Sequence, residues 1–289
     1  MTATKLHVTK PYLTTTHGVL YGCDCLVLLG ALRSASVDCV FADPPFNLGK
    51  DYGQNIDDAR KSEEYLAWCW RWLEECCRVL KPGGSLFVYA LPRWAYRFAA
   101  YLEERSMEFR HWIALTMKGS YPRGRKLYPA HYALLYFSKD GPPVTFNKVR
   151  TPVVTCRHCG GEIRDYGGHR KALNPAGLNL TDFWEDTSPN RHRGWKVRPG
   201  VNELKPKIPA RAIEIATDLG DVILDPFGGG GSTYAEAQRR ERRWIGSEVG
   251  GANCAAIERR LRALESLSVG KRPDGLADLF VRNSLTLIG

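Results

Sequence analysis

Residues 221–233, Asp-Val-Ile-Leu-Asp-Pro-Phe-Gly-Gly-Gly-Gly-Ser-Thr, are the stretch that decides the fold. Residues 221–225 form a short, mainly apolar run, which is typical of a buried strand. The glycines that follow allow a tight turn and a close approach of the backbone to a ligand. A helix predicted over Thr233–Arg240 would then present free backbone N–H groups to a carboxylate or phosphate. The stretch therefore predicts a strand, a ligand-binding loop and a helix.

The residues after this stretch continue the same alternation. A strand is predicted over Arg243–Glu248 and a helix over Asn253–Leu267, and this βαβ pattern indicates a doubly wound α/β sheet. Glu248 ends the strand, where an acid can accept hydrogen bonds from ribose hydroxyls. The loop lacks the Lys-Ser/Thr pair of a phosphate-binding Walker loop and the spacing of a dinucleotide fingerprint. A nucleoside that also carries a carboxylate, such as S-adenosylmethionine, fits this pattern.

A second motif, Asp43-Pro44-Pro45-Phe46, follows the apolar run Val37–Asp43, which is predicted to be a parallel strand. The two prolines remove two N–H donors, so the loop presents acceptors, namely the Asp43 carboxylate and the Pro44 carbonyl. An exocyclic amino group of a base has two protons to donate to such acceptors, and Phe46 offers a face for stacking an extruded base. A rigid turn capped by an aspartate is the structural alternative.

Periodicity predicts the remaining elements and the division of the chain. Helices are expected over Glu63–Leu80, Arg93–Glu104 and Lys207–Asp218, strands over Ser85–Ala90, Phe109–Met117 and His131–Ser138, and an end to the first helix at Lys81-Pro82-Gly83-Gly84. Residues 140–204 show little periodicity and are too long for an ordinary loop. We therefore expect a core made of residues 18–139 and 205–267, an inserted recognition region at 140–204, and a tail at 268–289.

The composition of the chain indicates which class of partner it binds. The 289 residues are 44% hydrophobic, and no stretch approaches the roughly 20 apolar residues of a membrane span. The first residues lack an apolar signal core, so a cytoplasmic protein without membrane contact is expected. The net charge is +10, and residues 93–214 hold 22 basic and 11 acidic residues against 19 and 20 elsewhere. This surplus favours a polyanion-binding region over a merely solvated basic surface.

The basic region contains the candidate DNA contacts. Cations there can neutralise phosphates, and arginine can also read guanine edges. The candidates are Lys118, Arg123, Arg125, Lys126, Arg191, Arg193 and Lys196. The same region holds Cys156 and Cys159, whose spacing suits two ligands of a structural Zn²⁺ ion. Two free thiols in a turn are the alternative, because the sequence has no second pair of this kind among its nine cysteines.

The two motifs together resemble the amino-methyltransferases of DNA. That family has an Asp/Asn/Ser-Pro-Pro-aromatic motif and a Phe-x-Gly-x-Gly cofactor motif, and their order here is similar to that of the β class. Further similar segments are 21–25 (Tyr-Gly-Cys-Asp-Cys), 80–89 and 202–213, the last containing Lys205-Pro206. The resemblance covers about residues 18–265 and implies a Rossmann-like, doubly wound mixed sheet of seven strands.

The resemblance also implies an activity and a set of site residues. The expected reaction is direct methyl transfer from S-adenosylmethionine to a base amino nitrogen in double-stranded DNA, without a catalytic cysteine, by a type II-like or orphan site-specific enzyme. Adenine N6 is favoured by the aspartate at position 43, and cytosine N4 is the alternative. The residues implied as catalytic are Asp43, Pro44, Pro45 and Phe46, and those implied for the cofactor are Asp24, Cys25, Asp43, Lys205, Asp225, Phe227, Gly229, Gly231, Ser232, Thr233 and Glu248.

Rival functions remain at this point. Methyltransferases of RNA bases or of protein glutamine use similar loops but usually place the cofactor motif first, and the opposite order here argues against them. An inactive DNA-binding homologue is disfavoured because Asp43, Gly229, Gly231 and Glu248 are all present. The β-class resemblance further suggests a homodimer.

Overall fold

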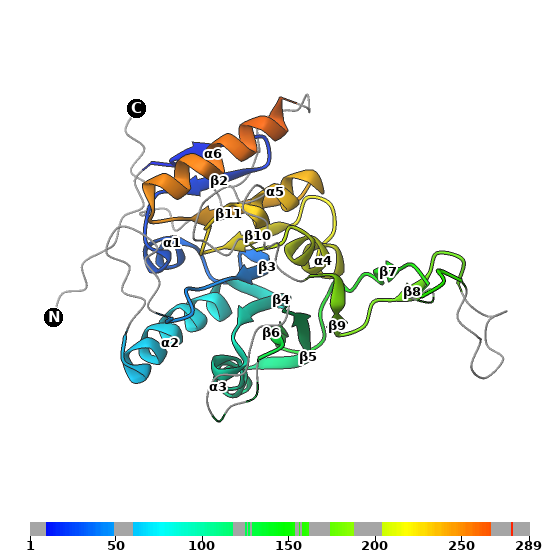
Figure 1. Cartoon of the computed structure of the whole chain (residues 1–289). Helices are drawn as coiled ribbons and strands as arrows, with labels where there is room; N and C mark the ends of the chain where they lie inside the picture. The colour runs from blue at the N-terminus through cyan, green and yellow to red at the C-terminus, as the bar shows by residue number, and fades with distance from the viewer. Residues whose placement is uncertain are drawn as a thin grey trace.

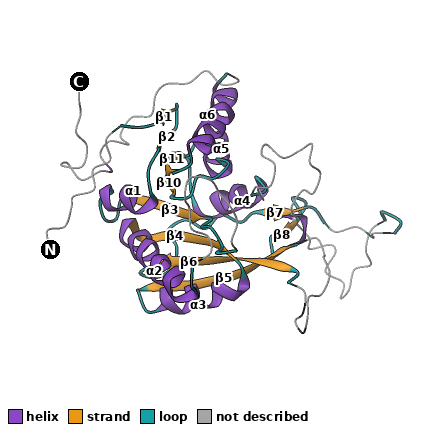
Figure 2. Ribbon diagram, turned by 60° about the vertical axis from the view of Figure 1, so that its left-hand side comes forward, coloured by secondary structure: helices purple, strands orange, loops and turns teal. Residues whose placement is uncertain are grey.

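The computed structural model contains one large mixed sheet between two helical layers (Figures 1 and 2). It describes residues 10–48, 60–117, 125, 127, 129–153, 156, 158–161, 174–187, 204–266 and 279. The strands are β1 (Leu13–Thr14), β2 (Gly18–Tyr21), β3 (Val37–Ala42), β4 (Leu80–Ala90), β5 (Met107–Thr116), β6 (His131–Lys139), β7 (Arg150–Thr151), β8 (Leu178–Asn179), β9 (Phe183–Trp184), β10 (Val222–Asp225) and β11 (Arg243–Ser247). The helices are α1 (Cys25–Ala31), α2 (Ser62–Val79), α3 (Pro92–Glu103), α4 (Lys207–Ala216), α5 (Ser232–Arg239) and α6 (Gly251–Glu265), with a 3-10 turn, η2, at Glu185–Thr187.

The order of strands in the sheet is β1-β2-β11-β10-β3-β4-β6-β5-β9. Strands β2, β11, β10, β3 and β4 run parallel, and β6 is antiparallel to both of its neighbours. The predicted doubly wound α/β class is therefore confirmed. The strands of 18–139 and 205–267 interleave, since β10 and β11 lie between β3 and β2, so these two ranges build one sheet.

Two cores fix the three layers. Alternate residues of β3 point to opposite faces: Val40 and Ala42 pack under α1, α2 and α3, whereas Cys39 and Phe41 pack under α4, α5 and α6. A strand covered on both faces reads as a continuous apolar run, which explains why this segment could be recognised from its sequence. Among the described helices, none is long and apolar enough to cross a bilayer.

Two details differ from the sequence predictions. The sheet has nine strands in the described chain instead of seven, because the two-residue strands β1 and β9 add at its edges. The segment Lys81–Gly84 lies inside β4 and not between a helix and a strand. It is an irregularity in which Leu80 pairs with Val37 and Ser85 pairs with Cys39, so the prolyl-glycyl turn bulges while pairing continues on both sides.

A segment projects from the core as an arm, here defined as the described residues 140–153, 156, 158–161 and 174–187. Its β7 and β8 pair in a separate two-stranded ribbon that extends away from the large sheet (Figure 1). The arm returns through β9, which pairs in parallel with β5, so its base is part of the main sheet. Beyond Ser266 the structure describes Leu279, which is 9% exposed and accepts a hydrogen bond of 2.8 Å from the Arg33 amide.

Candidate active site

Four neighbouring parallel strands end at one edge of the sheet and bring the predicted motifs together. In spatial order these are β2, β11, β10 and β3. They are followed by Asp24, Glu248, the glycine loop (residues 226–231) and Asp43, respectively. Because the carboxyl ends of adjacent parallel strands meet at the same edge, segments more than 200 residues apart in the chain form one site.

The glycine loop turns back against β11 and α6. Gly231 has φ +72°, and a Cβ atom there would lie 2.9 Å from the Ile257 side chain. The Gly228 amide donates to the Ser247 carbonyl at 2.8 Å, and the Gly231 amide to the Gly228 carbonyl at 2.7 Å. Glycine is therefore needed at 231 both for the left-handed backbone and for close packing on α6.

Glu248 is buried at 7% exposure and holds several backbone groups. Its Oε2 atom accepts from the Gly229 amide at 2.7 Å. Its Oε1 atom accepts from the Gly250 amide at 2.7 Å and from Asn253 Nδ2 at 3.0 Å. A carboxylate accepts about four hydrogen bonds in all, so this set leaves acceptor capacity for a ligand hydroxyl.

Asp225 lies beneath the glycine loop at 2% exposure. Burial raises the pKa of its carboxyl to about 7, and the charge of Glu248 adds to this rise. Hydrogen bonds from the Thr233 side chain and the Phe227 amide oppose the rise. The Asp225 side chain thus connects the start of the loop, at Phe227, to the first turn of α5, at Thr233.

The other residues predicted to contact the cofactor occupy distinct positions around this loop. Asp24 caps α1, accepting from the Leu26 amide at 2.8 Å, while the Cys25 side chain is buried in the core and can offer a ligand only its backbone. The Phe227 ring packs against Trp72, at 5.2 Å between ring centroids. Ser232 Oγ donates to the Leu204 carbonyl at 3.2 Å, which brings the segment of Lys205 beside the loop.

The loop of Asp43 follows β3 directly and is bordered by aromatic rings. The Phe46 ring lies 5.6 Å from the Tyr89 ring and 5.9 Å from the Tyr132 ring, measured between centroids. Burial raises the pKa of Tyr89 well above its usual value, and the nearby charge of Asp43 raises it further. Tyr89 and Tyr132 were not predicted as site residues. Tyr89 could have been, because it lies near the end of the strand that neighbours β3.

Two further contacts fix the same loop from α2 and α3. The Tyr65 hydroxyl donates to the Pro45 carbonyl at 2.8 Å, and Trp94 Nε1 donates to the Phe46 carbonyl at 2.9 Å. Asn47, with φ +56°, donates from Nδ2 to the Arg60 carbonyl at 2.8 Å. Sequence reasoning placed neither Tyr65 nor Trp94 in the site, since both belong to amphipathic helices and read as ordinary core residues.

The buried cysteines are not suited to nucleophilic chemistry. Burial raises the thiol pKa of all of these residues, which keeps them protonated near neutral pH. They are Cys25, Cys39, Cys69, Cys76, Cys77 and Cys254. That no cysteine at all takes part in catalysis stays a prediction, since Cys23, Cys156 and Cys159 are not among these buried residues.

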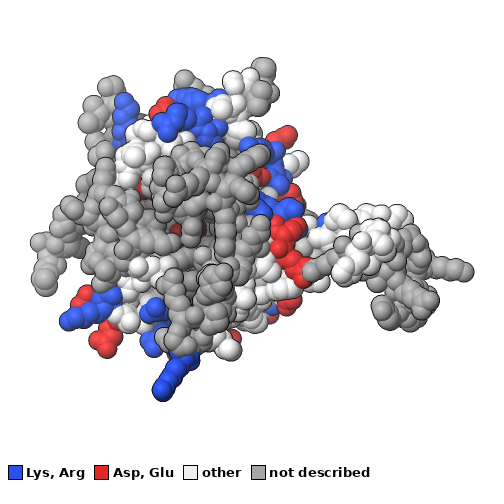
Figure 3. Space-filling model, viewed as in Figure 1, with Lys and Arg blue, Asp and Glu red and all other residues white. Residues whose placement is uncertain are grey.

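The predicted DNA contacts fall mainly outside the described residues. Of the seven, the structure describes Arg125, which is exposed. Lys118, Arg123, Lys126, Arg191, Arg193 and Lys196 lie outside the described ranges. On the face shown in Figure 3, most of the described surface of the arm is uncharged, and Lys and Arg side chains are spread over the core.

The Cys156–Cys159 segment forms a tight turn on the arm. The Gly160 amide donates to the Cys156 carbonyl at 2.9 Å, and the Cys156 amide to the Gly161 carbonyl at 2.8 Å. Hydrogen bonds from the backbone of Cys159 and His158 lower the pKa of the Cys156 thiol. Within the described part of the chain, no group of three or more His, Cys, Asp or Glu side chains converges on a metal position.

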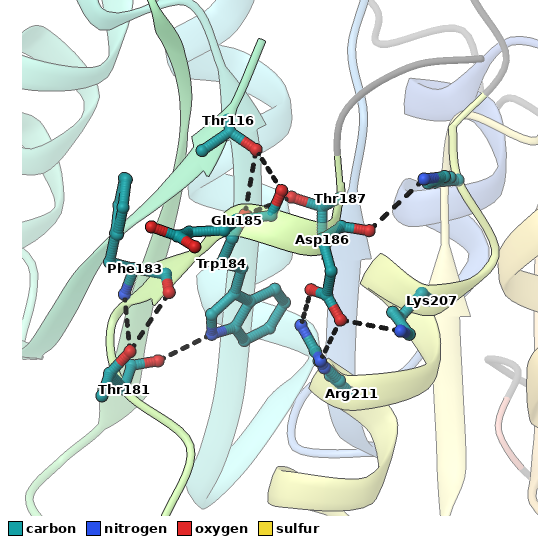
Figure 4. A network of polar contacts seen from close by, with 10 residues as sticks. Thr116, Thr181, Phe183, Trp184, Glu185, Asp186, Thr187, Lys207 and Arg211 are labelled. Atoms are coloured by element: carbon teal, nitrogen blue, oxygen red, sulfur yellow. Dashed lines mark hydrogen bonds and ion pairs between the residues drawn. The ribbon is translucent and has the colours of Figure 1, made fainter. Parts of the chain in front are cut away.

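The base of the arm is fastened to the core by Asp186 (Figure 4). Its carboxylate accepts from Arg211 at 2.7 and 2.9 Å and from Lys207 Nζ at 2.7 Å, and its carbonyl accepts from Lys205 Nζ at 3.3 Å. Beside it, Thr116 Oγ1 donates to the Glu185 carbonyl at 2.7 Å. Lys205 thus links the segment next to the glycine loop with the arm.

A cavity of about 250 Å³ lies between β5, β6 and the base of the arm. His111, Tyr136, Phe146 and Trp184 are among its lining residues. None of the lining residues belongs to the motifs at the edge of the sheet, so this cavity is separate from the site described above.

Comparisons with known proteins agree with this geometry. Residues 37–259 match the family model of DNA methylases. The chain is 48% identical over 253 residues to the type II methyltransferase M.BamHI of Bacillus amyloliquefaciens, covering 88% of this chain and 59% of that protein. It therefore spans about three fifths of the length of M.BamHI.

Two solved structures share the fold. The PvuII DNA methyltransferase, which is cytosine-N4-specific, superposes with a TM-score of 0.64 at 20% identity, over 88% of this chain and 89% of that one. The M1.HpyAVI–SAM complex superposes with a TM-score of 0.57 at 18% identity, over 84% of this chain and 98% of that one.

Proposed function

Because the chain belongs to the DNA methylase family, we propose that it transfers a methyl group from S-adenosylmethionine to the exocyclic amino nitrogen of a base in double-stranded DNA. The observation that carries this proposal is the adjacency of β3 and β10. The acceptor loop of Asp43 follows one strand and the glycine loop follows the other. A base amino group and a methyl donor bound at these loops would meet at one edge of the sheet.

The residues of the cofactor half fit a nucleoside with an amino-acid tail. Glu248 is buried at the end of β11 and keeps acceptor capacity for ribose hydroxyls. The first turn of α5 offers backbone N–H groups to a carboxylate, whereas the amides of Gly228, Gly229 and Gly231 already donate within the protein. When bound, S-adenosylmethionine supplies an electrophilic methyl group on a sulfonium sulfur.

The residues of the catalytic half act on the base. In the proposed reaction the Asp43 carboxylate and the Pro44 carbonyl accept hydrogen bonds from the two N–H bonds of the amino group, which directs the nitrogen lone pair toward the methyl carbon. The C–N bond forms as the bond between the methyl carbon and sulfur breaks, and the methylated nitrogen then loses one proton to solvent. Phe46 stacks on the extruded base. No strong base is required for this arrangement, since hydrogen bonding to the amino group and alignment of the nitrogen with the methyl carbon lower the barrier.

One experiment tests the activity and identifies the base. The protein is incubated with S-adenosylmethionine and unmethylated DNA, and the digested nucleosides are analysed by mass spectrometry, with Asp43→Ala as the control. N6-methyladenine is the product favoured by Asp43. N4-methylcytosine is the second candidate, since the structurally similar PvuII enzyme is cytosine-N4-specific. The absence of both products would contradict the proposed function.

The basic residues of the middle region are proposed as the DNA contacts. These are Lys118, Arg123, Arg125, Lys126, Arg191, Arg193 and Lys196. The support is the charge surplus of residues 93–214, with 22 basic and 11 acidic residues. DNA affinity should then fall steeply as salt rises, because bound phosphates release counterions. A flat salt dependence would contradict these contacts.

The Cys156–Cys159 turn supports a separate structural proposal. Two thiolates on such a turn can supply two of the four ligands of a structural Zn²⁺ ion that orders the arm. Metal analysis of gently purified protein tests this, with Cys159→Ser as the matched variant. Protein that contains no zinc would overturn it.

A further inference from the structure

Two buried aromatic side chains hold the loop of residues 43–46 by its carbonyl groups. Tyr65 lies in the first turn of α2 and Trp94 near the start of α3. Each is 3% exposed, and their rings lie 4.8 Å apart between centroids. As described above, Tyr65 holds the Pro45 carbonyl and Trp94 the Phe46 carbonyl. Two helices therefore reach the loop through one aromatic pair.

The chemistry of the loop makes these two bonds important. Pro44 and Pro45 have no N–H groups, so neither residue can be fixed by donating from its own backbone. The loop must instead be held through its carbonyls. Within the described part of the chain, no residue donates a hydrogen bond to the Pro44 carbonyl. The carbonyls of Pro45 and Phe46 are held by Tyr65 and Trp94, which we call the clamp. The Pro44 carbonyl remains available as an acceptor.

We infer that Tyr65 and Trp94 are positioning residues for methyl transfer. This inference rests on the proposed function. By fixing the carbonyls of Pro45 and Phe46, the pair sets the direction of the Pro44 carbonyl and the place of Asp43. Misplacement of a reacting group by about 1 Å can lower a rate about 100-fold, so a loop with few anchors gains from such a clamp.

A role in packing alone makes a different prediction. Tyr65→Phe keeps the ring in the core and removes only the hydroxyl. Tyr101→Phe is a matched control, because the Tyr101 hydroxyl of α3 donates to the Trp70 carbonyl of α2 at 3.2 Å. That bond joins the same two helices away from the loop. Trp94→Phe removes the indole donor, whereas Trp94→His keeps a ring N–H.

The test compares four quantities for each variant: the single-turnover methylation rate, the Kd for S-adenosylmethionine, the Kd for DNA and the Tm. We expect Tyr65→Phe and Trp94→Phe to lose about 10- to 100-fold in rate, with both Kd values close to those of the native protein. Tyr65→Phe should also keep the native Tm, whereas Trp94→Phe leaves part of a buried site empty and should lower the Tm. Trp94→His should recover part of the lost rate. Tyr101→Phe should methylate at the native rate.

Three outcomes would overturn the inference. Native rates in Tyr65→Phe and Trp94→Phe would show that the loop needs no clamp. A loss of rate in Tyr65→Phe that comes with a lower Tm and a weaker Kd for S-adenosylmethionine would show a packing role. If the native protein itself yields no methylated nucleoside, the proposed function fails first, and this outcome is distinguishable because it precedes any comparison of variants.

Discussion

The Gly229 amide donates a hydrogen bond of 2.7 Å to the Glu248 carboxylate, which joins the glycine loop after β10 directly to the end of β11. The other carboxylate oxygen of Glu248 accepts from Gly250 and Asn253 at the start of α6. One side chain thus sets the positions of two loops. Under the proposed function it also faces the ribose of the cofactor.

Replacing Glu248 should therefore weaken cofactor binding. Glu248→Ala removes acceptors for the loop and for the ligand, and hydrogen bonds to a charged group contribute about 1.5–3 kcal/mol, which corresponds to about 10- to 100-fold in Kd. Calorimetric titration with S-adenosylmethionine measures the effect. Glu258→Ala, on the surface of α6, is the control. An unchanged Kd in Glu248→Ala would mean that the ribose contact is misplaced.

Replacing Asp43 should affect the chemical step and spare DNA binding. Asp43→Ala removes one of the two acceptors for the amino group, so the methylation rate should fall by about 100-fold or more. Asp43→Asn keeps an acceptor oxygen and should retain measurable activity. Radiolabel transfer gives the rate, and fluorescence anisotropy gives the DNA affinity. Full activity of Asp43→Ala would exclude the catalytic role.

Asp225 should make the free energy of unfolding depend on pH above the pKa that its carboxyl has in the unfolded state. Burial raises its pKa to about 7 from an ordinary 3.8, so the folded state binds this proton more tightly than the unfolded state does. The contribution to stability is complete below about pH 4 and is lost as the pH rises through 7. Relative to the native protein, Asp225→Asn should gain about 3 kcal/mol of stability as the pH rises from 5 to 8.

Urea unfolding at pH 5 and pH 8 measures the Asp225 effect. Asp140→Asn, at an exposed position, is the control. If the free energies of unfolding of Asp225→Asn and Asp140→Asn change by the same amount between the two pH values, Asp225 is not the group responsible.

Asp186 should affect the pH dependence of stability in the opposite sense to Asp225, because its pKa is lowered in the folded protein. Burial raises its pKa, but hydrogen bonds and charges of Arg211 and Lys207 outweigh this and lower it to about 2 (Figure 4). Its contribution to stability is therefore present above the unfolded value of 3.8 and is lost as the pH falls through about 2. Asp186→Asn should destabilise the protein at pH 7, where Arg211, 8% exposed, loses its charged partner.

Unfolding measured at pH 7, 4 and 2.5 tests this prediction. The difference between Asp186→Asn and the native protein should shrink toward the lowest pH, and Glu258→Gln should show little difference at any pH because surface pairs contribute about 0–1 kcal/mol. A difference that stays constant with pH would contradict the role of the Asp186 charge.

The sequence by itself determined the elements whose cause is local. Apolar residues at helical spacing predicted α2 within one residue at each end, and the continuous apolar run of β3 followed from burial on both faces of the sheet. The glycine loop and the Asp43 loop could be recognised because each follows directly on a strand. Their meeting could be expected because carboxyl ends of parallel strands share an edge.

Only the tertiary structure decided the contacts between distant segments. The clamp of Tyr65 and Trp94 joins residues about 20 and 48 positions from the loop they hold. The anchoring of the arm through Asp186 and Arg211 spans 25 positions. Such pairs produce no periodic pattern in the sequence. A buried tyrosine or tryptophan in an amphipathic helix has the same spacing whether or not its polar atom contacts the catalytic loop. The partner of that polar atom is fixed by how the helices pack on the sheet, and a local pattern of residues does not contain this information.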